Sequence, residues 1–327
     1  MGYVLDPSLT RTSFSLSVLT LPKYINADGL IPFLGQLAEH SDESGLVMDF
    51  TGLQRVSPAG LAALTACMTG RERRRVTTKV VGLETCAIGA YLRRMNLLRL
   101  CGLEHGEESF ERHDPGGRFV PLEEIPHRVE DLGARIAACI APGGEDYENP
   151  NAGLYDAAFY LITEMANNVR QHSRGMGFVA AQTTPADGFV RIAIADCGCG
   201  IPGSLKAAGF PWVQDLPDED IIEQAMVARV SSKGQPANEG VGLTLSSRIV
   251  DLMGGRMLIA SGAGTVVRSN NAALKKGCFA EGVRFPGTLV AISFRRSAAS
   301  DFEFKLHQAK ELEIPLRVSP YPATFQP

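Results

Sequence analysis

The alternation of apolar and polar residues divides the first third of the chain into strands and helices. Residues 13–20 alternate with the period of two that is typical of a strand, and residues 27–40 place large apolar residues three and four positions apart, as on one helix face. Further strands are predicted at 46–50 and 77–81, and further helices at 58–69 and 85–98. Strands alternating with helices of this size predict a small α/β domain over residues 12–102.

A polar segment without periodicity follows this domain. Residues 103–124 contain Pro-Gly-Gly and many charged side chains, which predicts a linker. Helices are predicted next at about 125–141 and 153–172, followed by a strand-rich part, so a second domain is expected over residues 125–297. The proline-rich end of the chain predicts a loosely packed C-terminal tail over residues 298–327.

The composition is that of an ordinary globular protein. The 327 residues are 45% hydrophobic and 21% charged, which argues against a disordered, collagen-like or coiled-coil chain. A net charge of −4 gives no overall basic field for nucleic acid or an anionic membrane. No apolar run has the length of a membrane span, and the first residues lack the pattern of a signal peptide. Seven scattered cysteines favour reduced thiols, so a cytoplasmic location is expected.

Three polar residues form a column beside the apolar stripe of the helix predicted at 153–172. Glu164, Asn168 and His172 follow one another at intervals of four, so a regular helix places them on one face. A carboxylate, an amide and an imidazole in one column could hold a metal ion and activate a water molecule. Taken alone, the triplet is better explained as a surface helix that carries these polar residues by chance.

An aspartate and two glycines end the next apolar strand pattern. The run VRIAIAD ends at Asp196, and Gly198 and Gly200 follow it directly. A carboxylate at such a strand end could accept a hydrogen bond from the exocyclic amine of adenine, while the glycines would let a flat ligand approach the backbone. A tight turn or a calcium loop is the alternative, although the further acidic oxygens of a calcium loop are missing.

Glycines also precede a helical pattern near residue 243. The segment Glu239-Gly-Val-Gly-Leu243 places Gly240 and Gly242 before TLSSRIVDLM, where free N–H groups at a helix start could bind phosphate. The dinucleotide-binding pattern is incomplete, because its third glycine and its downstream acidic residue are missing. Each motif is weak by itself, but their order and separation along the chain are specific.

In combination, these motifs resemble the GHKL superfamily, which is the ATP-binding fold of gyrase, histidine kinases, certain chaperones and mismatch-repair ATPases. The resemblance covers about residues 125–297 and implies a GHKL (Bergerat) α/β sandwich, in which helices back a mixed sheet and a lid covers the nucleotide. A closing Gly-Thr at Gly287-Thr288 matches the place where the family puts a residue near the adenine. The three boxes of the superfamily match Glu164, Asn168 and His172, then Asp196, Gly198 and Gly200, then Gly240, Gly242 and Leu243.

The resemblance implies ATP and Mg²⁺ as ligands. Asn168 would coordinate Mg²⁺, and Asp196 would bind the adenine amine. Glu164 would be the general base in members that hydrolyse ATP or phosphorylate serine.

The phosphates would lie at the other end of the implied site. Gly240 and Gly242 would present backbone amides to them, with His172 close by. A lid over about residues 203–239 would include Lys233, which could contact the γ-phosphate.

Residues 12–102 resemble a STAS domain, the fold of anti-sigma-factor antagonists. The resemblance rests on LVMDFTGLQRVSPAGLAALTACM (46–68), an apolar strand whose loop leads into a helix. In that family the loop usually reads Asp-Ser-Ser-Gly, and its first serine accepts phosphate from a GHKL kinase. Here Pro58 stands at the acceptor position, and Ser57 is better explained as the N-cap of a helix that has Pro58 in its first turn.

Together, the two resemblances predict an ATP-binding signalling regulator. The preferred form is an Mg-dependent ATPase or protein serine kinase of the anti-sigma-factor type, with a protein partner such as a STAS-domain or sigma-factor-like regulator. Two alternatives stay open, namely a GHKL ATPase that acts as an ATP-driven conformational switch and a non-catalytic ATP-sensing scaffold. No direct contact with nucleic acid or membrane is expected, and the possibility of a homodimer stays open.

Overall fold

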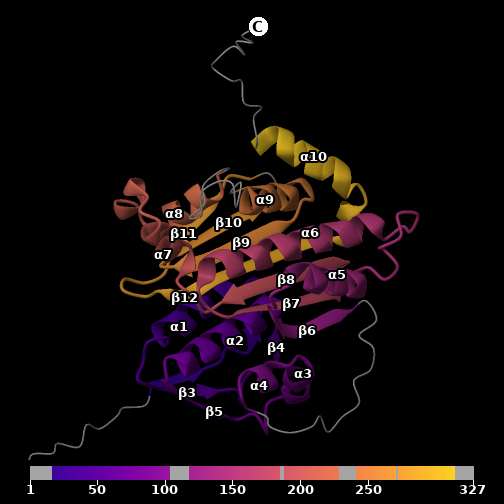
Figure 1. Ribbon diagram of the computed structural model, residues 1–327. Helices are drawn as coiled ribbons and strands as arrows, with labels where there is room; N and C mark the ends of the chain where they lie inside the picture. The colour runs from indigo at the N-terminus through magenta and orange to yellow at the C-terminus, as the bar shows by residue number, and fades with distance from the viewer. Residues whose placement is uncertain (1–16, 104–117, 185–187, 228–240, 270–271, 314–327) are drawn as a thin grey trace, which may run out of the picture.

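The chain folds into four stacked layers (Figure 1). The computed structural model describes residues 17–103, 118–184, 188–227, 241–269 and 272–313. From one side to the other, the layers are a group of helices, a seven-stranded sheet, the helix pair α1 and α2, and a three-stranded sheet. Within the described residues, no helix has both the length and the apolar character needed to cross a lipid bilayer.

Residues 17–103, called the N-terminal half below, form the predicted alternation of strands and helices. Its sheet is parallel, with the strand order β1-β3-β5. The helix predicted at 85–98 is divided in two, because Asn96 adopts a left-handed conformation with φ +63°. The elements of this half are β1 (Ser17–Thr20), β2 (Tyr24–Ile25), α1 (Leu30–Glu39), β3 (Gly45–Asp49), β4 (Arg55–Val56), α2 (Pro58–Arg73), β5 (Thr77–Val81), α3 (Gly89–Arg94) and α4 (Leu97–Leu100).

The start of α2 has the predicted cap. The Ser57 hydroxyl accepts a hydrogen bond from the Gly60 backbone N–H at 3.3 Å, and Pro58 opens the helix. The N-cap interpretation of Ser57 is therefore confirmed, since this contact satisfies one of the free N–H groups of the first turn.

The seven-stranded sheet has the order β11-β10-β9-β12-β8-β7-β6. All pairings between its described strands are antiparallel, whereas a mixed sheet was expected. Only a few residues separate β7 from β8 and β9 from β10 along the chain, and connections this short can join only antiparallel neighbours. The strands are β6 (Phe119–Glu124), β7 (Gly177–Thr184), β8 (Phe189–Asp196), β9 (Arg256–Gly262), β10 (Gly264–Ser269), β11 (Lys275–Cys278) and β12 (Phe285–Arg295).

Helices cover the outer face of this sheet, so the expected α/β sandwich is confirmed. Alternate residues of β7 and β8, among them Val179 and Ile192, face these helices in one buried cluster. The helical elements are α5 (Val129–Ile140), α6 (Ala152–Asn168), the π-helix η1 (Val169–Ser173), α7 (Gly200–Ala207), the 3₁₀ turns η2 (Pro211–Gln214) and η3 (Arg296–Ala299), α8 (Asp218–Ala225), α9 (Gly242–Leu252) and α10 (Phe302–Glu313).

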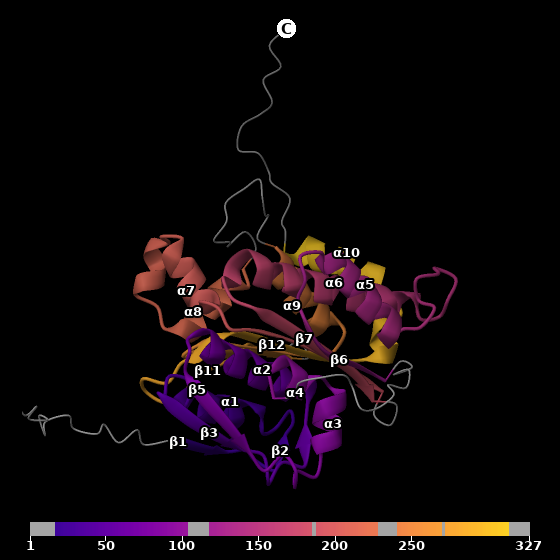
Figure 2. The same ribbon diagram turned by 60° about the horizontal axis from the view of Figure 1, so that its bottom comes forward.

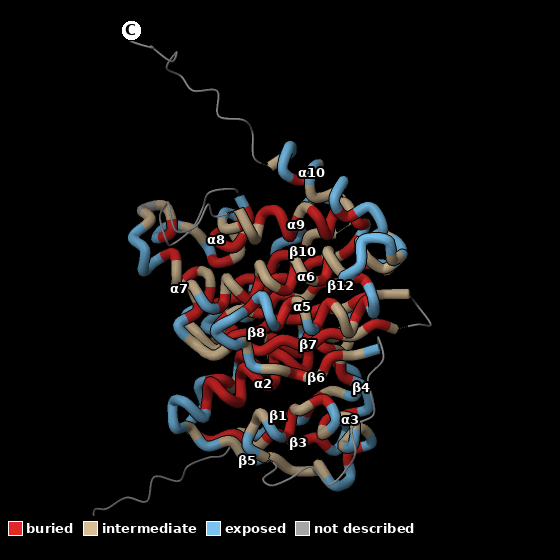
Figure 3. The backbone as a smooth tube through the Cα atoms, turned by 45° about the vertical axis from the view of Figure 1, so that its right-hand side comes forward, coloured by how far each residue is buried: buried red, intermediate tan, exposed pale blue. Residues whose placement is uncertain are grey.

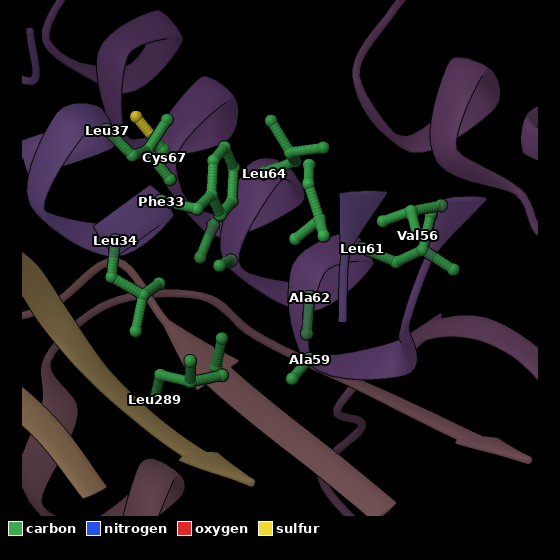
Figure 4. Packing of buried hydrophobic residues seen from close by; sticks show 14 of the residues in the cluster. Phe33, Leu34, Leu37, Val56, Ala59, Leu61, Ala62, Leu64, Cys67 and Leu289 are labelled. Atoms are coloured by element: carbon green, nitrogen blue, oxygen red, sulfur yellow. The ribbon is translucent and has the colours of Figure 1, made fainter. Parts of the chain in front are cut away.

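The inner face of the same sheet packs on α1 and α2 of the N-terminal half (Figure 2). Helix α2 lies across β7, β8 and β12, and almost all of its residues are buried. Small side chains allow this close approach, because the alanines of α2 pack in one buried cluster with Ala180, Ala193 and Ala195 of the sheet. Larger side chains fill the margins, where Leu289 projects from β12 toward the helices that carry Leu34 and Ala59 (Figure 4).

The two halves therefore share one hydrophobic core. Buried residues run from the seven-stranded sheet through α2 to the small sheet (Figure 3). The polar segment before the second half also contributes, because residues 119–124 of the predicted linker form the edge strand β6. Its Leu122 N–H donates to the Met95 carbonyl at 3.1 Å, and the Asn96 amide donates to the Leu122 carbonyl at 3.0 Å.

The prediction of a loose tail after residue 297 is wrong as far as residue 313. Helix α10 packs on α9 and α6, with Phe302 and Ala309 buried two turns apart on one face. Glu313 at its end forms an ion pair with Arg248 of α9 at 3.1 Å. The helix is thus a fixed part of the outer layer.

Candidate functional site

A cavity of 360 Å³ lies between α6, the end of β8, the first half of β12, and the starts of α7 and α9. This volume is within the range of small-molecule sites. Motifs that are far apart in the sequence meet here. Eight of the predicted residues line the cavity, namely Glu164, Asn168, His172, Asp196, Gly200, Gly242, Leu243 and Thr288.

Asp196 is one of the most deeply buried polar residues that line this cavity. It is the last residue of β8, is 3% exposed, and pairs across the sheet with Thr288 of β12. Its Oδ1 atom accepts hydrogen bonds from the Ser173 hydroxyl at 2.7 Å and from the Gly198 N–H at 2.8 Å. A buried carboxylate with several donors is held in a fixed orientation.

Two opposing effects set the charge of this carboxylate. Burial raises the pKa of Asp196 to about 6, while hydrogen bonds from Ser173, Gly198 and Thr288 act to lower that pKa. At neutral pH the group is therefore mainly ionised and can accept one more hydrogen bond from a ligand donor.

The glycines after Asp196 are required by close packing. A Cβ atom on Gly198 would overlap the backbone and hydroxyl of Ser173. Gly200 opens α7 with φ +69°, where a side chain would also come within 2.7 Å of the Ser261 hydroxyl. The loop can thus lie directly against the end of the helix that carries the polar column.

The polar column itself faces the cavity, as predicted. Glu164 and Asn168 belong to the last two turns of α6, and His172 follows in the π-helix η1. Burial raises the pKa of the Glu164 carboxyl. A Cβ atom on Gly242 would overlap the Glu164 carboxylate, so the start of α9 lies directly against this group.

The donor set suits a small hard cation together with an anionic ligand. Asn168 and Glu164 line the same cavity, and Mg²⁺ prefers amide and carboxylate oxygens as ligands while keeping several waters. The N–H groups at the start of α9 are next to them, where an anion is favoured.

Part of the predicted lid lies in the described residues. Leu205, Val213 and Ile221 of α7, η2 and α8 form a small cluster of their own beside the cavity. Lys233 and Gly240, predicted to contact the phosphates, lie outside the described residues.

Two serines of the site were missed by the sequence reasoning. Ser173 binds Asp196, and the Ser261 hydroxyl donates to the Gly287 carbonyl at 2.9 Å and accepts from the Ile201 N–H at 2.9 Å. Ser173 directly follows His172, so its position was visible, but the π-helical turn that directs it to Asp196 has no signal in the hydrophobic pattern.

Comparison with known families supports the resemblance to the GHKL superfamily. Residues 153–273 match the family described as histidine kinase-, DNA gyrase B-, and HSP90-like ATPase. The matched segment contains the polar column, Asp196 and the glycines on both sides of the cavity, whereas Thr288 lies beyond it. This part of the chain is a GHKL-type ATPase domain. No curated protein matches the chain.

Proposed function

We propose that the protein is an ATP-binding regulator that holds Mg·ATP in the cavity between α6, β8 and α9. Asp196 is the observation that carries the proposal, since it is a buried, pre-oriented carboxylate inside the matched ATPase domain. The exocyclic amine of adenine can donate to this carboxylate. Guanine presents a carbonyl at the equivalent ring position, which would face a negative charge, so ATP is preferred over GTP.

The phosphate end of the ligand is assigned to the opposite side of the cavity. Asn168 would hold Mg²⁺, and the N–H groups at the start of α9, at Gly242, would contact phosphate oxygens. Gly240 and Lys233 belong to the same proposal from the family motif. Bound Mg²⁺ would offset the charge of the phosphates.

Glu164 is proposed as the general base. Its carboxylate would take the proton from an attacking hydroxyl, the γ-phosphoryl group would move to that oxygen, and ADP would leave. The raised pKa of Glu164 supports this role, because a base with a pKa nearer to neutrality accepts a proton more readily.

The attacking hydroxyl is proposed to be a serine of a separate protein, as in anti-sigma-factor serine kinases. The N-terminal half would be the STAS-like module that recognises this partner. Its helix α2 is buried against the ATPase sheet, so the partner would have to bind the outer face of β1, β3 and β5 or the helices α3 and α4.

A conformational switch is the second candidate, and one contact favours it. Gly70 near the end of α2 lies so close to Cys197 that a Cβ atom at position 70 would be 3.0 Å from the Cys197 Cβ atom. Cys197 directly follows Asp196. A movement of this loop on nucleotide binding would therefore displace the end of α2 in the N-terminal half.

Incubation with γ-labelled ATP and Mg²⁺ separates these candidates. The wild-type protein and Glu164→Ala are each incubated alone and with a panel of purified STAS-domain proteins. Label on a serine of one panel member, absent with Glu164→Ala, supports the kinase. Free phosphate without any labelled protein supports the switch, and bound ATP without turnover supports a non-catalytic scaffold. Absence of ATP binding contradicts the proposal as a whole.

A further inference from the structure

The hydroxyl of Ser173 is enclosed between the polar helix and the loop that follows Asp196. Ser173 is 4% exposed and ends the π-helix η1. Its Oγ atom donates to Asp196 Oδ1 at 2.7 Å and accepts from the Gly175 N–H at 3.0 Å. The Gly175 contact uses the oxygen as an acceptor, which leaves its single proton directed to the carboxylate.

The backbone of Ser173 joins the same two segments. Its carbonyl accepts a hydrogen bond from the Cys199 N–H at 2.8 Å. Gly198 fits beside it only because that residue has no side chain. Ser173 is therefore the point at which the helix carrying Asn168 meets the loop carrying the adenine-binding carboxylate.

We propose that Ser173 is a positioning residue that keeps Asp196 ionised and directed at the adenine amine. The proposal rests on the assignment of Asp196 to adenine, and it adds a residue outside the three motif boxes. Ser173 contacts no ligand atom in this proposal and acts through Asp196.

Removal of this donor would have a defined consequence for charge. Burial favours the protonated acid, and the donated hydrogen bonds are what oppose burial at Asp196. A protonated Asp196 loses one acceptor site and the negative charge that attracts the amine. Without the hydrogen bond from Ser173, Asp196 becomes protonated at a higher pH, so ATP binding weakens at low pH.

Other titratable groups surround the loop and are the same in wild type and variant. Burial raises the pKa of the Cys197 and Cys199 thiols in the loop, and the charge of Asp196 raises it further. The charged or titratable side chains that act on these thiols or line the cavity beside Asp196 include Arg73 of α2, Glu164 of α6, His172 of η1 and Arg174 after it. Because all of these are retained, and because ATP itself titrates identically in each measurement, the ratio of two affinities at one pH isolates the effect of Ser173.

The test compares the ATP affinity of wild type, Ser173→Ala and Ser173→Thr at pH 6 and pH 8.5. For Ser173→Ala we expect ATP affinity close to wild type at pH 8.5, where Asp196 is ionised in both proteins. At pH 6 we expect about tenfold weaker binding, since a hydrogen bond to a charged acceptor changes an equilibrium constant by about that factor. Ser173→Thr keeps the hydroxyl and should restore the wild-type pH profile. In an Asp196→Asn background, Ser173→Ala should cause no pH-dependent loss.

The outcomes distinguish this proposal from the one on which it rests. Wild type that binds no ATP at either pH contradicts the nucleotide site itself. Wild-type binding with equal loss in Ser173→Ala at both pH values overturns the positioning role, because a purely structural defect does not depend on the charge of Asp196. Unchanged affinity in Ser173→Ala at pH 6 overturns it as well.

Discussion

The shared core predicts that a defect deep in the N-terminal half destabilises the ATPase half by the same amount. Leu46 is the second residue of β3 and is fully buried, on the far side of α1 and α2 from the nucleotide cavity. Leu46→Ala removes buried methyl groups and leaves a cavity, which costs about 3 kcal/mol in a well-packed core. If the halves unfold together, the whole chain loses this stability.

The free energy that couples the two halves follows from the apolar side chains that their separation would expose. Phe178, Leu258 and Leu289 on the inner face of the seven-stranded sheet are 2% exposed or less, and each large side chain gains about 1.5–3 kcal/mol from full burial. Exposure of these three alone would cost roughly 4.5–9 kcal/mol, which is comparable to the total stability of about 5–15 kcal/mol for a native protein. The ATPase half is therefore not expected to remain folded after the N-terminal half has unfolded.

Pulse-labelling hydrogen exchange across a urea titration measures both halves in one sample. Peptides from β3 and β5 report on the N-terminal half, and peptides from α6 and β8 report on the ATPase half. We expect all four to lose protection at one urea concentration, and Leu46→Ala to lower that midpoint equally for all. Val18→Ala is the matched control, because Val18 lies beside Val47 on the neighbouring strand but is 58% exposed, so a change within about 0.5 kcal/mol is expected.

A midpoint for α6 and β8 that stays at the wild-type value in Leu46→Ala would refute this reasoning. It would mean that the two halves are independent domains that only touch. The packing of α2 on the sheet would then contribute little to stability.

Three further predictions concern the site and the helix start. Asn168→Ala should lose the Mg²⁺-dependent part of ATP affinity in a calorimetric titration with and without Mg²⁺, while its circular dichroism stays unchanged; equal affinity with and without the metal in wild type would contradict this. Glu164→Ala should reduce phosphate release or transfer by about 10²–10⁴-fold and leave ATP affinity nearly unchanged, so wild-type turnover would place the base elsewhere. Ser57→Ala should lower the free energy of unfolding by about 1 kcal/mol as a lost N-cap, and mass spectrometry after incubation with Mg·ATP should find no stoichiometric phosphate on residues 57–60; quantitative phosphate on Ser57 would reverse that interpretation.

The sequence predicted the elements whose own pattern decides their structure. The strand at 77–81 was placed within its observed bounds, and α6 began within one residue of the prediction, because apolar periodicity and local turn residues determine such segments. The conjunction of Glu164, Asp196 and Gly242 in one cavity was also predictable, although only from the order of the motifs and not from any one of them.

Tertiary contacts determine the features that the sequence did not reveal. Strand β6 contains Pro121, which suits an edge strand. The polar residues, the Pro-Gly-Gly sequence and the missing periodicity of this segment predicted a linker instead. Helix α10 buries little beyond Phe302 and Ala309, so its sequence shows no clear apolar face. The burial of α2 could not be seen because small residues such as Ala62 are compatible with either a surface or a tightly packed interface.

The binding of ATP to wild type and to Asp196→Asn at pH 8, measured by calorimetry, tests the central claim most directly. The substitution keeps the shape of the side chain and replaces the charged acceptor by an amide. We predict that wild type binds ATP, that it binds GTP more weakly, and that Asp196→Asn loses about 1.5–3 kcal/mol of ATP binding free energy, while its urea unfolding remains cooperative. ATP affinity that is the same in a folded Asp196→Asn protein, or no ATP binding by wild type, would contradict the assignment of this cavity to the adenine nucleotide.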